Sequence, residues 1–156
     1  MPGAGFYSIH AARLCFRSDG RWYADDEPVT HERLARLFSR YLRRKPGGGF
    51  EIWIDERYHA DVEVEDTLYV VSSVHAAADG SLSVELNDGS SEPLDPTSLS
   101  VGRDNVVYCR VKHGRERARL LRPAYYQLAP LIDEGAPGQY QLHCGRHTYP
   151  IGRLDS

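Results

Sequence analysis

The sequence lacks long apolar runs and holds only three cysteines. No stretch approaches the roughly 18 consecutive apolar residues that a membrane-spanning helix requires, so no membrane span is expected. The opening residues MPGAGFYSIHAAR lack the basic stretch and apolar core of a secretory signal. Cys15, Cys109 and Cys144 form an odd set without a CxxC pair, which favours free thiols over a disulfide framework. We therefore expect a cytoplasmic protein.

Signatures of catalysis and of metal or phosphate binding are also missing. His143, Cys144 and His147 lie around an expected turn, and no second ligand pair stands elsewhere, so no metal site is predicted. Glycines 47–49 lack the Lys and the Ser or Thr that complete a phosphate-binding loop. No Ser or Cys nucleophile signature accompanies the histidines. We expect no cofactor and no enzyme, and a hydrolase or transferase using the carboxylates of residues 63–66 is the less favoured alternative.

Basic residues are scarce in the middle of the chain and concentrated after it. Residues 46–100 hold twelve Asp or Glu and a single basic residue, Arg57. Residues 103–122 hold six Arg and one Lys against Asp104 and Glu116, although the whole chain carries a net charge of -3. This asymmetry predicts either pairing within the protein or an acidic partner for residues 103–122.

The first half reads as strands around one helix. Asp-Gly at residues 19–20 tolerates the positive φ angles of a tight hairpin turn. Apolar residues then recur at helical spacing after Thr30, which we take as the N-cap, and the helix should stop before Pro46. The expected strands of this half are 7–18, 21–23, 50–54 and 58–64.

The second half repeats this order of strands, helix and strands. Pro123 is typical of the first turn of a helix, and Gly135 should end that helix. The elements expected here are strands at 68–77, 81–86, 105–112 and 115–121, a helix at 123–134, and strands at 139–144 and 147–151.

These elements predict an α+β fold built from two small, similar subdomains that share an interface. The expected boundaries are residues 1–66 for an N-terminal α+β subdomain and 67–156 for a C-terminal one. Neither half alone is long enough to bury a large core, so we expect the two sheets to meet.

The hairpin around His113-Gly114 is the most informative segment, because a two-residue turn fixes which side chains stand opposite one another. An apolar face should pair Val107 with Leu120 and Cys109 with Ala118. The other face should pair Tyr108 with Arg119 and Arg110 with Arg117. Like charges directly opposite are destabilising, so this arginine pair implies an acidic partner.

Two partners for these arginines stay open. A phosphate-bearing ligand suits them, because guanidinium groups bind phosphate bidentately while Tyr108 stacks on a base or ring. The alternative is internal, because Glu63, Glu65 and Asp66 lie at a strand end in the acidic half and could neutralise the arginines across the subdomain interface.

Several motifs together resemble the bacterial family labelled domain of unknown function 1285. They are, in order, Asp19-Gly20-x-Trp22, Pro28-Val29, Leu34-x-x-Leu37-Phe38-x-x-x-Leu42, Val62-Glu63-Val64-Glu65-Asp66 and Arg117-Ala118-Arg119-Leu120-x-Arg122-x-x-Tyr125-Tyr126-x-Leu128. The resemblance implies a duplicated α+β core whose second half is similar to a pleckstrin-homology barrel capped by a helix. It also implies a signalling role in which the domain interface binds a nucleotide-type ligand. The matching positions here are Glu63, Glu65, Asp66, Arg117, Arg119, Arg122, Tyr125 and Tyr126.

Two functional hypotheses from different classes follow. The first is a signalling module that holds an anionic, nucleotide-like small molecule between its halves through Arg110, Arg117, Arg119 and Arg122. The second is a protein-interaction module that uses a basic helix face, formed by Arg33, Arg36, Arg40 and Arg43, together with the His113-Gly114 hairpin. Nucleic acid is the less favoured partner for that face, because the chain is acidic overall and carries no recognised nucleic-acid-binding motif.

Overall fold

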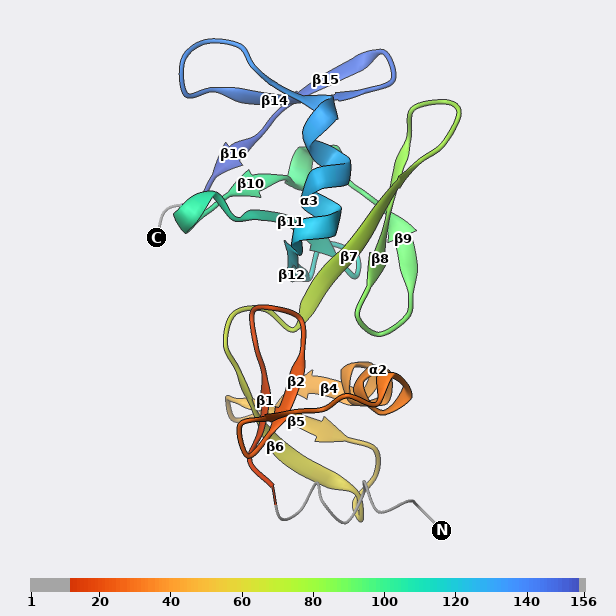
Figure 1. Cartoon of the computed structure of the whole chain (residues 1–156), viewed down its shortest axis with the longest axis vertical. Coiled ribbons are helices and arrows are strands. Elements are labelled where there is room, and N and C mark those ends of the chain that lie inside the picture. The colour runs from red at the N-terminus through yellow and green to blue at the C-terminus, as the bar shows by residue number, and fades with distance from the viewer. Residues whose placement is uncertain (1–11, 155–156) are drawn as a thin grey trace. The chain divides into compact units, whose positions relative to one another are not determined.

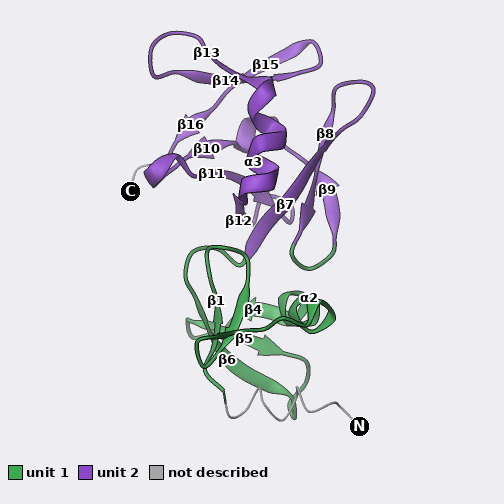
Figure 2. Ribbon diagram, viewed as in Figure 1, with its two compact units in different colours: residues 1–68, 87–89 green, residues 69–86, 90–156 purple. Residues whose placement is uncertain are grey.

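The computed structural model describes residues 12–154, which form two compact units (Figures 1 and 2). Unit 1 contains the described residues up to Leu68 together with 87–89. Unit 2 contains residues 69–86 and the described residues from Ser90 onward. Each unit has its own sheet and its own helix (Figure 1).

Unit 1 is a six-stranded sheet with one helix. Its strand order is β3-β2-β1-β6-β5-β4, in which β1 and β6 run parallel and the other neighbours are antiparallel. Its elements are β1 (Leu14–Phe16), β2 (Trp22–Ala24), β3 (Glu27–Pro28), α2 (Glu32–Tyr41), β4 (Leu42–Arg44), β5 (Phe50–Trp53) and β6 (His59–Val64). Both predicted hairpins, β1–β2 and β5–β6, are confirmed. Residues 7–11 of the first predicted strand lie outside the described residues.

The ends of α2 differ from the prediction. The N-cap is His31, whose Nδ1 accepts a hydrogen bond from the backbone N–H of Leu34 at 3.2 Å, so Thr30 was the wrong cap. At the other end the helix stops at Tyr41, because Leu42 adopts extended backbone angles and begins β4. Arg43 therefore lies on a strand and not on the predicted basic helix face.

The core of unit 1 centres on three aromatic rings and one buried hydroxyl. The Trp22 ring lies 5.1 Å from that of Phe16 and 5.3 Å from that of Phe38, centroid to centroid. Its indole Nε1–H donates to the Oγ of Ser39 at 2.9 Å, and the side-chain amide of Asn87 donates to the same oxygen at 3.1 Å. Trp22 and Ser39 are both buried, so this oxygen satisfies a donor that has no access to water.

Unit 2 is built on a seven-stranded sheet in the order β16-β10-β11-β12-β7-β8-β9. Its strands are β7 (Tyr69–Ala76), β8 (Leu82–Leu86), β9 (Ser91–Pro93), β10 (Ser100–Val101), β11 (Val107–Val111), β12 (Glu116–Leu120) and β16 (Gly152–Arg153). Short 3-10 turns occur at η1 (Pro96–Ser98) and η2 (Arg103–Asn105). Helix α3 (Arg122–Leu128) packs against β7 and buries Ala124 and Leu128 in the core of the unit.

The second helix is shorter than the predicted 123–134. It ends at Leu128 and gives way to the 3-10 turn η3 (Ala129–Leu131), after which β13 (Ile132–Glu134) begins. Pro130 accounts for this ending, because it has no N–H to donate and its ring clashes with the preceding turn of a helix. Strand β13 pairs with β14 (Tyr140–Cys144), which pairs with β15 (His147–Pro150), so a separate three-stranded sheet follows α3.

The architecture confirms the predicted α+β class. Among the described residues it consists mostly of sheets, with α2 and α3 as its two α-helices. The predicted duplication and the pleckstrin-homology-like barrel are not confirmed, since the seven-stranded sheet of the described chain ends at β16 and β9 without closing. The boundary between residues 66 and 67 stays a prediction. Neither described helix is long and apolar enough to cross a bilayer.

Replacing Ser39 with Ala tests the buried hydroxyl. The change leaves the indole N–H of Trp22 without its acceptor, so the free energy of unfolding should fall by about 1–3 kcal/mol. Trp22 and Trp53, the chain's two tryptophans, both lie in unit 1, so fluorescence-monitored urea unfolding reports on that unit. Thr30→Ala is the control and should be close to neutral, because Thr30 is exposed and does not cap α2. Equal stability of both variants would contradict the assignment.

Burial separates Cys109 from the other two thiols. It is 1% exposed, and this burial, together with the nearby carboxylate of Glu92, raises the pKa of its thiol to about 12. Because the thiolate is the reactive form, iodoacetamide at mildly alkaline pH should leave Cys109 unmodified in the folded protein. The half-buried Cys15 should react, and all three cysteines should react in guanidinium chloride. Peptide mass spectrometry reads this out, and modification of folded Cys109 as fast as Cys15 would contradict it.

Candidate functional site

The predicted arginine face forms as expected in unit 2. The β11–β12 register pairs Arg110 with Arg117, Tyr108 with Arg119 and Cys109 with Ala118. Cys109 and Ala118 are buried in the core, whereas Arg110 is exposed and Tyr108, Arg117 and Arg119 are half-buried on the other side of the strands. We call these four side chains, Tyr108, Arg110, Arg117 and Arg119, the arginine face.

Arg110 and Arg117 are the electrostatically unusual pair on this face. Directly opposite residues of an antiparallel pair have Cβ atoms about 4.5–5.5 Å apart, so two positive side chains start from neighbouring positions. Among the described residues, neither guanidinium has a carboxylate within ion-pair distance; the described partner of Arg117 is the Tyr108 ring, whose centroid lies 5.6 Å from its Cζ. This pair could bind an anion without first breaking an ion pair.

Tyr108 is held in place from one side by a glycine. A Cβ atom on Gly102 would come within 2.9 Å of Cε2 of Tyr108, so the ring lies directly against the backbone at the end of β10. This close packing keeps the ring beside Arg117 and leaves it half-buried.

Other cations near the arginine face have partners. Lys112 donates through Nζ to the Oγ of Ser90 at 3.0 Å, and the same atom lies 5.1 Å from the ring centroid of Tyr69. Its backbone N–H donates to the carboxylate of Glu92. Arg119 also has interactions of its own. Arg110 and Arg117 are therefore the candidate anion-binding residues of the arginine face.

The α3 residues of the predicted site are not all gathered on this face. Tyr125 lines a different cavity together with Val107, whose side chain belongs to the core side of β11. Tyr126 is 66% exposed and its ring stacks edge-on with that of Tyr125 at 5.8 Å. Arg122 is the exposed first residue of α3.

The acidic residues of the predicted site lie in unit 1, at the end of β6. The Glu63 carboxylate lies 3.8 Å from Nε of Arg13, and Glu65 accepts a hydrogen bond from the backbone N–H of Ser18 at 2.8 Å. Asp66 is exposed just after the strand. Glu65 thus fixes the β1–β2 turn, which is a structural role within unit 1.

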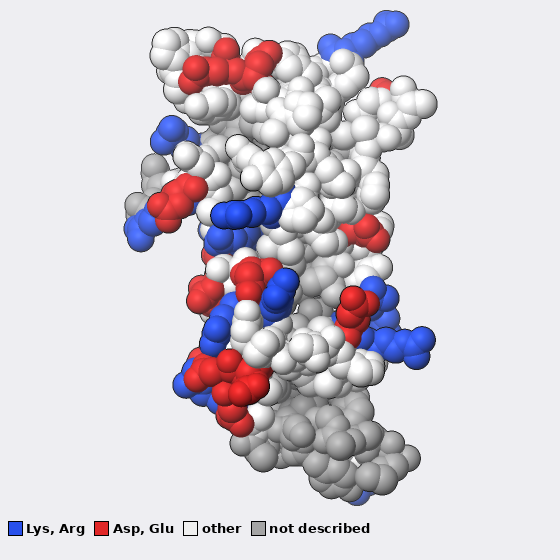
Figure 3. Space-filling view, viewed as in Figure 1, with Lys and Arg blue, Asp and Glu red and all other residues white. Residues whose placement is uncertain are grey.

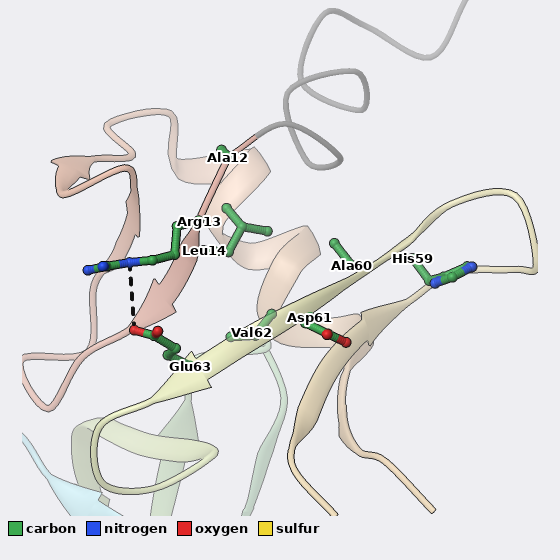
Figure 4. A pocket seen from close by; sticks show the side chains of 8 residues that line it. All are labelled: Ala12, Arg13, Leu14, His59, Ala60, Asp61, Val62 and Glu63. Atoms are coloured by element: carbon green, nitrogen blue, oxygen red, sulfur yellow. Dashed lines mark ion pairs between the residues drawn. The ribbon is translucent and has the colours of Figure 1, made fainter.

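A cavity of about 350 Å³ lies beside β1 and β6 (Figure 4). Glu63 and Arg13 face one another at one end of it, and Asp61, which also lines it, forms an ion pair with Lys45 at 2.8 Å. His59 has an interaction of its own. Because its charged groups are already paired within unit 1, this cavity is the weaker candidate for an anionic ligand.

Three of the four arginines of the predicted basic helix face lie on α2. Arg33, Arg36 and Arg40 are exposed on α2. Arg43 lies on β4, donates to the Glu51 carboxylate at 2.9 Å and lies over the Trp53 ring, so it is engaged within the sheet. Figure 3 shows acidic and basic side chains interspersed over the face drawn, without a large basic patch there.

The structure also shows a polar row that sequence reasoning missed. Nε2 of His143 lies 2.6 Å from Oδ2 of Asp133, and its Nδ1 lies 3.1 Å from Oγ1 of Thr148. Hydrogen bonds to two side chains lower the pKa of the Asp133 carboxyl. The bond to His143 has the larger effect and the bond to Gln141 the smaller one. The β14–β15 register pairs His143 with Thr148, whereas the predicted helix at 123–134 includes Asp133, so the sequence does not place Asp133 beside them. Among residues 12–154, no cluster of His, Cys, Asp and Glu suits a metal ion.

Two solved structures share this fold. A DUF1285 family protein from Silicibacter pomeroyi DSS-3 is 21% identical, with a TM-score of 0.68 over 90% of this chain and 80% of that one. A DUF1285 family protein from Shewanella baltica OS155 is also 21% identical, with a TM-score of 0.58 over 76% of this chain and 91% of that one. Comparison with family models and with curated proteins gave no match. At the level of the fold, these likenesses confirm the resemblance found in the sequence.

Replacing Arg110 with Gln tests the repulsion on the arginine face. Removing one of two facing charges should raise the free energy of unfolding by about 0.2–1 kcal/mol at low salt. High salt should remove most of this gain by screening the charges. Arg146→Gln, in the turn between β14 and β15, is the control and should change little, because Arg146 is exposed and no strand residue pairs opposite it. Urea unfolding followed by circular dichroism measures both variants, and a loss of stability in Arg110→Gln would show that this guanidinium has a stabilising partner.

Proposed function

We propose that this chain, which shares its fold with DUF1285 family proteins, is a ligand-binding module that holds an anionic, nucleotide-like small molecule on the arginine face of unit 2. The observation that supports the proposal is the direct pairing of Arg110 with Arg117 in the absence of a described carboxylate partner for either. A bound anion would replace the repulsion between the two guanidinium groups with attraction to a shared partner.

The chemistry of the residues favours phosphate as that anion. Each guanidinium presents parallel N–H donors that match two oxygens of a phosphate or carboxylate group. Arg117, which lies beside the Tyr108 ring, and the exposed Arg110 would contact the phosphate. The half-buried Tyr108 offers an aromatic surface for a base or sugar ring. Arg119 and Arg122 complete the positive surroundings in this proposal.

The proposed role is binding in signal transduction, without a catalytic step. A module of this kind needs a fixed site and no reacting group, and the arginine face has no side chain that serves as a nucleophile or general base. We also propose that unit 2 is a relative of the pleckstrin-homology fold, since it combines a seven-stranded sheet with one α-helix packed on its core side.

Charge reversal at Arg110 tests the proposal. Isothermal titration with pyrophosphate, AMP and ATP should give saturable binding to the unchanged chain. Arg110→Glu should weaken that binding at least about tenfold, which corresponds to the loss of one charge-assisted hydrogen-bonding group. The variant should remain as stable as the unchanged chain, because Glu at this position can pair with Arg117.

Arg115→Glu is the matched control. It makes the same charge change in the neighbouring turn and should leave the affinity within about twofold, apart from long-range electrostatics that salt screens. If none of the three compounds binds, or if both variants weaken binding equally, the proposal is wrong. Tighter binding of ATP than of pyrophosphate would specifically support a nucleotide-like ligand.

A further inference from the structure

A second cavity, of about 320 Å³, lies within unit 2 where the three-stranded sheet approaches β10 and β11. Its apolar lining includes Ile132 and Ile151, and its aromatic lining comes from Tyr125 on α3 and Tyr140 on β14. Two carboxylates, Asp133 and Glu134, complete one side of it. Its volume lies at the lower end of the range for small-molecule sites.

The path of the chain creates this cavity. After α3 ends, β13 pairs with β14, and after β15 the chain returns to the larger sheet, where Gly152 of β16 pairs with Ser100 of β10 (Figure 1). The three-stranded sheet is thus tied to the rest of unit 2 at both of its ends. Side chains from α3, β13 and β14 come together in the space that remains.

The aromatic groups of the cavity are accessible. Tyr125 is 38% exposed and Tyr140 is 41% exposed, although both rings also line the cavity. Exposed aromatic rings that border a concave surface are typical of binding sites, since a ring buries much apolar area at little entropic cost.

The charge at this cavity is negative. Asp133 and Glu134 line it, and no Lys or Arg among the described residues does. The ring of His143 lies between the two side chains, with Nε2 2.6 Å from Oδ2 of Asp133 and Nδ1 3.1 Å from Oγ1 of Thr148. This contact holds the Asp133 carboxylate in position.

Glu134 is held in a similar way. Its Oε2 accepts a hydrogen bond from the backbone N–H of Gly138 at 3.0 Å, which ties the carboxylate to the loop between β13 and β14. A backbone N–H is a neutral donor, so it leaves the negative charge of Glu134 in place. Two oriented carboxylates beside two aromatic rings form the combination that recognises organic cations, by Coulomb attraction and by cation–π contact.

The same residues argue against two other uses. Asp133 lines the cavity, whereas His143 and the hydroxyl of Thr148 do not. The hydroxyl therefore cannot attack a molecule bound in the cavity, which excludes it as a nucleophile there. The described residues near it contain no cluster that could coordinate a metal ion.

We propose that this cavity binds a small organic ammonium ion, with Asp133 and Glu134 attracting the charge and Tyr125 and Tyr140 contacting the ammonium and its attached carbon groups. The site differs from the arginine face in both position and charge preference. The proposal therefore stands whether or not the arginine face binds an anion.

Three probes of equal chain length separate charge from apolar contact: n-butylammonium, n-butanol and butyrate. Titrations of the isotopically labelled full chain, followed by NMR, should show saturable shifts at Tyr125, Tyr140 and Glu134 with n-butylammonium. Butanol should bind at least about fivefold more weakly, and butyrate should not bind, because the carboxylates repel it.

Paired variants locate the site. Glu134→Gln and Tyr125→Leu should each weaken n-butylammonium binding about fivefold or more. Tyr149→Leu and Asp104→Asn are the matched controls: Tyr149 lies on β15 and does not line the cavity, and Asp104 adjoins the cavity residue Asn105 without lining the cavity itself. Both should change the affinity by less than about twofold.

Several results would overturn the inference. Changes in the NMR shifts of the same residues on adding butyrate would show that the cavity does not select a positive charge. Equal effects of the site and control variants would show that n-butylammonium binds elsewhere. Tighter binding of Nα-acetyl-lysine amide than of n-butylammonium would show that the ligand is the ammonium group of a protein side chain and not a free small molecule.

Discussion

The turn at His113 and Gly114 fixes which side chains of unit 2 face the core and which face outward. Lys112, His113 and Gly114 all have left-handed φ angles, of 55°, 59° and 76°, and the backbone N–H of Arg115 donates to the carbonyl of Lys112, which closes the turn. The side chains of a strand alternate between its faces, so a slip of one residue would exchange the two faces. Arg110 and Arg117 would then enter the core, and Cys109 and Ala118 would leave it.

Magnitudes explain why the chain accepts two facing arginines. The same register buries Val107, Val111 and Leu120, and burying an aliphatic side chain of this size contributes about 1.5–3 kcal/mol. Repulsion between like charges directly opposite one another costs about 0.2–1 kcal/mol at an exposed position. Core burial therefore determines the register, and the charge pair follows from it, which leaves the arginine face available for an anion.

Much of this arrangement could be predicted from the sequence, because local turn chemistry determines it. The Asp19-Gly20 and His113-Gly114 turns each set one hairpin, and the pairing of Arg110 with Arg117 follows directly from the second. The helix ends were less predictable. His31 replaced Thr30 as the cap through a ring nitrogen, an acceptor that the usual preference for Ser, Thr, Asp and Asn does not anticipate.

The sequence did not predict strand β13, and this omission concealed more of the structure than the errors at the helix ends. The prediction places Asp133 and Glu134 in a helix that Pro123 opens and Gly135 ends, whereas Pro130 ends the helix earlier and both residues lie on β13. Their meeting with Tyr140 depends on the pairing of β13 with β14, a tertiary contact that sequence periodicity does not encode. The cavity therefore could not be predicted from the sequence, whereas the arginine face could.

The two proposed sites are connected through β11. Val107 lines the tyrosine-containing cavity, and the next residue, Tyr108, belongs to the arginine face on the opposite side of the strand. The two sites thus share a strand but no side chain, and they favour charges of opposite sign. A ligand at one site would alter affinity at the other only by shifting β11 itself, because coupling between sites requires a differential effect on a common element. The close packing of Tyr108 on Gly102 and the burial of Val107 both resist such a shift, so the structure favours two sites that fill independently.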